Sequence, residues 1–152
     1  MKFAVSHPFY IVNGISICYK CSAKIPVITI AGFNSIGSDL TFYNNLTFID
    51  ERLVRILTVK FPFYRIGFSK FIQKEYWANH CIYCDALQGD FFLHYEVDGT
   101  FNPQDLNNCK ELILTPVYCD VSISIEAEFS QNKICGATLD VGLMENEIII
   151  KT

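Results

Sequence analysis

The sequence Cys81-Ile-Tyr-Cys84 repeats the spacing of Cys18-Tyr-Lys-Cys21, and 59 residues separate the two pairs. A gap of two residues lets a tight turn direct both sulfurs of a pair toward one ion, with backbone N–H groups turned toward the sulfurs. Two such turns supply the four thiolates of a tetrahedral site, in which each Zn–S bond is about 2.3 Å long. The sequence therefore predicts one structural Zn2+ per chain, bound by Cys18, Cys21, Cys81 and Cys84, with no open coordination position for catalysis.

The long spacer is the unusual feature of this pattern, because such sites commonly have about 15–20 residues between the pairs. A spacer folded as strand, loop and helix would bring the pairs together. Two other interpretations stay open: the four cysteines are buried thiols, or a pair is redox-active. His80 is a candidate replacement ligand, although we prefer a packing role beside the site. Cys119 is expected in the core and Cys109 in an exposed loop.

The composition is that of one folded domain. The chain has 152 residues, of which 51% are apolar and 14% aromatic, so it can bury a core without relying on the metal alone. We expect a single zinc-binding domain, zinc-ribbon-like over residues 1–100 and a C-terminal β part over residues 101–152. No apolar run approaches the roughly 20 residues of a membrane-spanning helix, and the N-terminus is a poor signal peptide. Both observations favour a cytoplasmic location.

Local patterns predict an α+β fold that is mainly antiparallel β-sheet with one main helix. Residues 117–130 alternate between apolar and polar side chains, as in a strand with one face on the core. The helix is expected over residues 46–59, before Pro62. We expect a short hairpin or bent strand at 9–18 with its turn at Asn13-Gly14, a mobile loop at 32–45, a second hairpin turn at Asp98-Gly99, and strands at 25–31, 87–97, 135–140 and 147–151. Residues 61–76 are aromatic and basic, and their pattern supports no assignment.

The block Tyr76-Trp-Ala-Asn-His-Cys-Ile-Tyr-Cys84, taken with the first cysteine pair and Pro26-Val-Ile, resembles a set of small uncharacterised bacterial zinc-binding proteins of zinc-ribbon type. Those proteins combine a C-x2-C ahead of a Val/Ile-rich strand with a Tyr-Trp-Ala-Asn-x-Cys-x2-Cys block. The resemblance covers residues 1–100, and it implies a zinc site and little about function. Members commonly have Gly after the second Cys of a pair, where this chain has Ser22 and Asp85; Asp tolerates such a position better than Ser.

Charge is divided unevenly along the chain. Residues 1–84 carry nine Lys and Arg against four Asp and Glu, whereas residues 85–152 carry three against twelve. An acidic surface attracts and orients a basic partner. We therefore predict a non-catalytic module that binds another protein, for example a bacterial immunity protein that neutralises a basic, nuclease-type toxin. The candidate partner-binding residues are Asp85, Asp90, Glu96, Asp98, Asp105, Glu126, Glu128, Asp140, Glu145 and Glu147.

A zinc-ribbon protein that binds nucleic acid is the alternative hypothesis. Residues 52–74 contain no acid, and basic groups neutralise phosphates while aromatic rings stack on bases. The candidate nucleic-acid-binding residues are Arg52, Arg55, Lys60, Arg65, Lys70 and Lys74, interleaved with Phe61, Phe63, Tyr64, Phe68 and Phe71. The competing explanation is that the basic side chains line a solvated face while the aromatic side chains enter the core.

No catalytic motif is recognisable in the sequence. His7, His80 and His94 lie in no known nucleophile–base pattern, and the eight glycines form no phosphate-binding loop. His94-Tyr-Glu96 matches the H-x-E of zinc deaminases, but the P-C-x-x-C that accompanies it there is missing. On a strand these two side chains would share a face, and an ordinary cross-strand ion pair would explain them. We expect the chain not to be an enzyme, and we keep an enzyme with an unfamiliar site as a third hypothesis.

Overall fold

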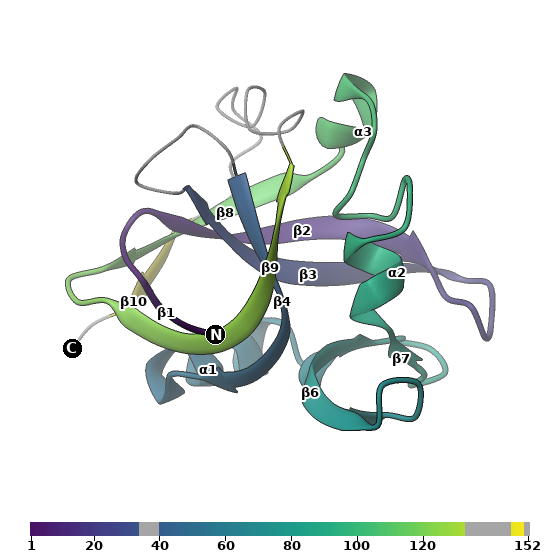
Figure 1. The fold of residues 1–152 in the computed structure, drawn as a ribbon, viewed down its shortest axis with the longest axis horizontal. Helices are drawn as coiled ribbons and strands as arrows, with labels where there is room; N and C mark the ends of the chain where they lie inside the picture. The colour runs from purple at the N-terminus through teal and green to yellow at the C-terminus, as the bar shows by residue number, and fades with distance from the viewer. Residues whose placement is uncertain (34–39, 133–146, 151–152) are drawn as a thin grey trace.

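The computed structural model describes residues 1–33, 40–132 and 147–150, and its centre is a large, mainly antiparallel β-sheet (Figure 1). The strand order of the main path is β1-β9-β4-β3-β2-β8-β10, in which only β10 runs parallel to its neighbour. These strands are β1 (Lys2–Val5), β2 (Phe9–Ile17), β3 (Lys24–Phe33), β4 (Leu40–Ile49), β8 (Ile113–Cys119), β9 (Ile123–Asn132) and β10 (Ile148–Ile150). Strands from the N-terminal and C-terminal parts of the chain are thus neighbours in one sheet, as in the pairs β1–β9 and β2–β8.

A smaller set of strands branches from β4. The hairpin of β5 (Tyr64–Ser69) and β6 (Lys74–His80) is continued by the short β7 (Leu87–Gln88), and β6 contacts β4 where Trp77 lies opposite Leu46. The described helices are α1 (Glu51–Lys60), α2 (Asp90–His94) and α3 (Leu106–Cys109). Figure 1 shows α2 next to β7, at the end of the molecule that holds β6. Both cysteine pairs lie at this end of the molecule.

The main sheet is buried on both faces, because successive side chains of a strand point to opposite sides. Along β2, Phe9 and Ile11 enter one core cluster, while Tyr10 and Val12 enter the other. Helix α1 covers the first cluster with two fully buried leucines, Leu53 and Leu57. The second cluster contains Leu93 of α2, Phe101 and Leu112, together with two of the four paired cysteines, Cys18 and Cys81.

The expected helix exists but begins later than predicted. Strand β4 continues through residues 46–49, because Phe48 and Ile49 pair with β9. Asp50 then caps the helix by accepting the N–H of Arg52 at 2.9 Å, which satisfies one of the free donors of the first turn. The helix ends at Lys60, ahead of Pro62.

The expected turn at Asn13-Gly14 is wrong. Strand β2 pairs with β3 without interruption from Phe9 to Ile17, and the chain reverses in the cysteine pair after Ile17. Glycine is needed at position 14 for space: a Cβ there would overlap the methyl group of Thr100 and lie 3.1 Å from Leu112 Cδ2. The loop expected at 32–45 is likewise wrong at its ends, where Gly32–Phe33 and residues 40–45 belong to β3 and β4.

Three further predictions meet different outcomes. Residues 87–97 form the short β7 and α2 in place of a strand, so Asp98-Gly99 is a turn after a helix and joins no hairpin. The alternating segment 117–130 is divided by a bend at 120–121 into the end of β8 and most of β9, where alternation holds over Ile123–Ala127. A strand is confirmed at 148–150, and the strand expected at 135–140 lies outside the described residues.

Across the described ranges, no helix is long and apolar enough to cross a membrane.

Candidate metal centre

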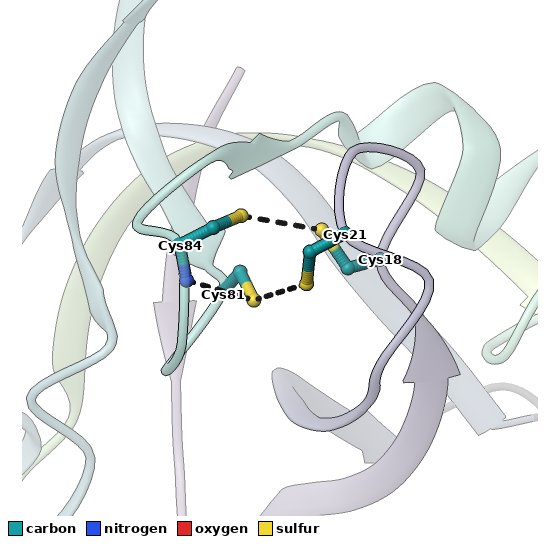
Figure 2. Close-up of side chains that lie close together, drawn as sticks. All are labelled: Cys18, Cys21, Cys81 and Cys84. Carbon is teal, nitrogen blue, oxygen red and sulfur yellow. Dashed lines mark hydrogen bonds between the residues drawn. The ribbon is translucent and has the colours of Figure 1, made fainter.

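The four cysteines of the two C-x2-C pairs come together where two turns face each other (Figure 2). The first pair occupies the turn between β2 and β3, and the second occupies the turn between β6 and β7. All four sulfurs lie within 4.8 Å of one another, and the Cys18–Cys84 and Cys21–Cys81 sulfurs are each 3.6 Å apart. A tetrahedron with Zn–S bonds of about 2.3 Å has sulfur–sulfur edges of about 3.8 Å. The cluster is therefore of the right size for one metal ion.

The two turns have the same backbone conformation. In each, the N–H of the first cysteine donates to the carbonyl of the alanine five residues on, at 2.9 Å (Cys18 to Ala23, and Cys81 to Ala86). The residue after the second cysteine donates its N–H back to the carbonyl of the first, also at 2.9 Å. That residue has a positive φ in both turns, 64° at Ser22 and 67° at Asp85. The repeated geometry makes the two pairs equivalent halves of one site.

Hydrogen-bond donors surround the sulfurs. The N–H of Lys20 points to Cys18 Sγ, and the N–H groups of Tyr83 and Cys84 point to Cys81 Sγ, each at 3.4 Å. The side-chain amide of Gln88 adds a donor to Cys18 Sγ, also at 3.4 Å. These donors stabilise negative charge on sulfur, which is the form in which cysteine binds a metal.

The pKa values agree with this arrangement. Burial alone would raise the pKa of Cys18, but hydrogen bonds from the turn's N–H groups and from Gln88 outweigh it and lower the pKa to about 6. Burial is likewise outweighed at Cys81, whose pKa is lowered by the N–H groups of Cys84 and Tyr83. One thiol in each pair is thus prepared to lose its proton.

Burial suits a structural site. Cys18 and Cys81 are buried in the second core cluster, whereas Cys84 is half-buried and Cys21 is exposed. Four sulfur ligands complete a tetrahedron and leave no position for a substrate. The described residues therefore contain a tetracysteine metal site, consistent with one structural Zn2+.

Cys109, Cys119 and His80 lie outside the ligand set. His80 is buried, and its Nδ1 lies 3.0 Å from the carbonyl oxygen of Ala78, as expected of a packing residue beside the site. Cys119 is partly buried against the first core cluster. Cys109 is fully buried and disulfide-bonded, so the expectation of an exposed thiol in a loop is wrong: α3 places it in the core.

The basic residues predicted for nucleic-acid binding do not form one open surface. Each of the three arginines has a carboxylate partner: Arg52 pairs with Asp50 at 2.8 Å, Arg55 with Glu51 at 2.9 Å, and Arg65 with Asp85. The three lysines, Lys60, Lys70 and Lys74, are exposed and have no ion pair within the described ranges.

The interleaved aromatic residues divide into two groups. Tyr64 is buried, and Phe61 and Phe63 pack partly buried against the first core cluster. Phe68 and Phe71 are exposed on the β5–β6 hairpin, with 53% and 76% of their surface accessible. Part of this segment enters the core, and part of it stays available to a partner.

The acidic candidates are dispersed, and one of them is wrong. Asp90 is only 3% exposed, because α2 turns it toward the sheet, so it cannot contact a partner. Asp85, Glu126 and Glu128 are already engaged by Arg65, Lys2 and Asn45, respectively, and Asp105 caps α3. Glu96 and Asp98 are exposed after α2, and Glu147 is exposed before β10. Asp140 and Glu145 lie outside the described residues.

The H-x-E of the sequence is no site either. His94 is buried between Phe42 and Phe101, with ring centroids 6.4 and 5.1 Å away, whereas Glu96 faces solvent. The cross-strand ion pair expected here is therefore wrong, because Asp90–His94 is a helix and not a strand. Burial lowers the pKa of His94 to about 3, so the ring is neutral.

An apolar groove lies beside the metal centre and was not foreseen from the sequence. Its volume is about 920 Å³. Its walls come from the end of β2, the tip of the β5–β6 hairpin, α2 and the turn after α2. The exposed apolar side chains on it are Ile15, Ile17, Tyr19, Phe68, Phe71 and Phe92. These residues come from three segments far apart in the sequence, so no local pattern signals the groove.

Comparisons with known proteins find no matching family model, no similar curated protein and no similar solved structure. The resemblance carried by the Tyr-Trp-Ala-Asn block is thus supported only as far as the four-cysteine cluster itself.

Proposed function

We propose that this chain is a non-catalytic protein-binding module whose binding surface is held in shape by one structural Zn2+. The observation that carries the proposal is the groove, where six large apolar side chains remain exposed on one concave surface. Soluble proteins rarely leave large contiguous apolar patches open unless a partner covers them.

Zinc is the metal that the donor set favours. Four thiolates in tetrahedral arrangement suit Zn2+ or an iron–sulfur cluster, and sulfur spacings of 3.6 Å fit a single ion. The ion would tie the β2–β3 turn to the β6–β7 turn. Ile17 and Tyr19 belong to the first turn region, Leu87 comes directly after the second, and all three line the groove. Metal binding and partner binding are therefore coupled in this proposal.

The acidic residues of the groove and of the C-terminal half favour a basic protein as the partner. Glu96 and Asp98 stand on the groove wall, and residues 85–152 carry a large excess of acid. Acidic groups around an apolar centre attract a basic protein and orient it. An immunity protein that covers a basic, nuclease-type toxin is the concrete version that we propose to test.

The test combines metal analysis with binding. We expect one zinc per purified chain, and chelation should lower the melting temperature and abolish binding to basic nuclease-type proteins encoded by neighbouring genes. Cys84→Ser should behave like chelation, whereas the matched control Cys119→Ser should keep both metal and binding. A stable, metal-free protein would refute the zinc site, and the absence of binding or nuclease inhibition would refute the partner class.

Nucleic-acid binding remains a second candidate because two exposed rings, Phe68 and Phe71, flank the exposed Lys70. Against it, Glu96 and Asp98 share the same groove and repel phosphate. If nucleic acid is the ligand, single-stranded RNA or DNA should bind with an affinity that falls steeply with salt, and Lys70→Glu should weaken it.

A further inference from the structure

One edge of β2 is unpaired beside the groove. Strand β2 pairs with β3 along its whole length, from Phe9 to Ile17. On its other side the ladder with β8 ends where Asn13 lies opposite Ile113. Residues 14–17 therefore lack a neighbouring strand on this side, within the part of the chain that the structure describes.

Two prolines show which backbone groups face this open edge. Pro116 lies opposite Tyr10 in the β2–β8 ladder, and Pro26 lies opposite Ile15 in the β2–β3 ladder. Because proline has no N–H, each pair is a position where the strands exchange no hydrogen bonds. Odd-numbered residues of β2 must then direct their N–H and C=O groups away from β3. Ile15 and Ile17 accordingly present theirs to the open edge.

The surroundings agree with this orientation. The Ile15 carbonyl accepts a hydrogen bond from the hydroxyl of Thr100 at 3.0 Å, on the side away from β3. No described backbone group accepts the N–H of Ile15 or Ile17 on that side. Main-chain groups at the rim of an apolar groove are the features used when a peptide adds a strand to a sheet.

The groove matches an extended chain in size and chemistry. Residues 14–17 span about 10–13 Å at the rise of a β-strand, and because Thr100 bonds the Ile15 carbonyl, the groups left for an added strand are the N–H of Ile15 and the N–H and C=O of Ile17. Phe68, Phe71 and Phe92 give apolar contacts for alternate side chains, and Phe71 and Phe92 lie 6.3 Å apart between ring centroids. Glu96 and Asp98 outnumber Lys70 among the charged residues that line the groove, so its charge suits a Lys or Arg.

We infer that the groove binds an extended segment of a partner protein, which pairs with the Ile15–Ile17 edge of β2 and carries apolar side chains alternating with a basic one. This inference rests on the proposed function and adds to it the binding mode. Nucleic acid fits less well, because it lacks main-chain N–H and C=O groups at strand spacing and is repelled by the two carboxylates.

The first experiment uses a phage-displayed library of random linear dodecapeptides on the zinc-loaded protein. Enriched peptides should share alternating apolar residues and one Lys or Arg. In the synthetic form of the best peptide, N-methylation at every second residue should weaken binding by about tenfold or more, because it removes a hydrogen bond to β2. Methylation at the intervening residues should leave the affinity within about twofold. The N–H groups of those residues point away from β2 and bond to water, and losing such a hydrogen bond costs far less.

A variant pair tests the same edge from the protein side. Ile17→Pro removes the N–H that faces the open edge and leaves the β2–β3 ladder intact, because that N–H does not take part in it. Ile17→Val keeps the N–H. We expect about tenfold weaker peptide binding for Ile17→Pro and little change for Ile17→Val, with melting temperature and zinc content checked for both. If Ile17→Pro fails to fold, the N-methyl series decides alone.

The outcomes separate this inference from the proposed function. An enriched peptide whose N-methyl series shows no alternation overturns strand addition. Whole basic proteins could bind equally to Ile17→Pro and wild type while no peptide is enriched. That result would support the proposed protein-binding function and refute strand addition as the binding mode. If neither peptides nor basic proteins bind, both proposals fail. Oligonucleotides that bind and compete with the selected peptide overturn the choice of occupant.

Discussion

Asp90 makes the stability of this protein depend on pH in a direction that is unusual for a carboxylate. It opens α2, is only 3% exposed, and accepts the N–H of Asn45 at 2.7 Å through Oδ2. Burial is the main influence on its pKa, which the Asn45 N–H lowers and the charge of Glu128 raises, and the result is a pKa of about 7. The folded chain therefore holds a proton there that the unfolded chain has released.

The sign of the effect comes from linkage between proton binding and folding. Below about pH 4 the carboxyl is protonated in both states, and its contribution to stability is fully present. As the pH rises through 7 this contribution is lost, because the folded state must bury a charge that the unfolded state carries in water. A difference of about three pKa units corresponds to about 4 kcal/mol, of which more than half falls between pH 5 and pH 8.

The perturbation is Asp90→Asn, which keeps an oxygen for the Asn45 N–H and cannot ionise. Urea unfolding of wild type and variant at pH 5 and pH 8 gives the difference in free energy of unfolding at each pH. We expect the variant to gain about 2–3 kcal/mol on wild type between the two values. The control Glu96→Gln removes an exposed carboxylate just after the same helix, and its difference from wild type should not change. If Asp90→Asn also shows a constant difference, the carboxyl is not buried as described.

Three further predictions concern the core and the metal centre. The contribution of His94 to stability should fall as the pH drops from about 6.5 toward 3, since unfolding lets His94 take up a proton that burial denies it; it opposes the contribution of Asp90 over this range, so His94→Leu should gain stability on wild type from pH 7 to pH 5 in urea unfolding. A Cβ at Gly67 would lie 2.6 Å from His80 Nε2, so Gly67→Ala should destabilise the fold by about 1–3 kcal/mol in thermal melts, whereas Gly32→Ala, with its nearest contact at 3.7 Å, should cost less. Gln88→Leu removes a donor to a site sulfur and should weaken zinc binding by about tenfold or more in competition with a chelating dye; unchanged affinity would mean that this contact is incidental.

Local patterns were reliable where one physical cause acted alone. The strict alternation over Ile123–Ala127 reflects a strand with one wet face, and it survives in β9. The segment after Asp50 has a capping residue, helical spacing and a terminating Pro62, and it is helical. Patterns with two possible causes misled: Gly14 resembles a turn residue, but it is required because Thr100 and Leu112 pack against the strand.

Short apolar segments were decided by tertiary contacts. Residues 46–49 continue the helical spacing of residues 51–60, yet pairing with β9 and β6 holds them in β4. Residues 90–94 contain the aromatic residues of a strand, yet they form α2, where Asp90 and Leu93 are buried together. The hydrogen bonds and burial that a neighbouring strand or sheet supplies exceed the small intrinsic preferences of such segments.

By itself the sequence determined the ligand set of the metal centre, because two C-x2-C pairs can turn four sulfurs toward one point whatever joins them. It also determined that the chain is mainly β-structure, because alternation of side chains is a local property. Only the tertiary structure decided which charges are exposed, which strand edge is open and where the groove lies. Those properties depend on contacts between segments far apart in the chain, such as the hairpin tip carrying Phe71 and the end of β2, and no local pattern records such contacts.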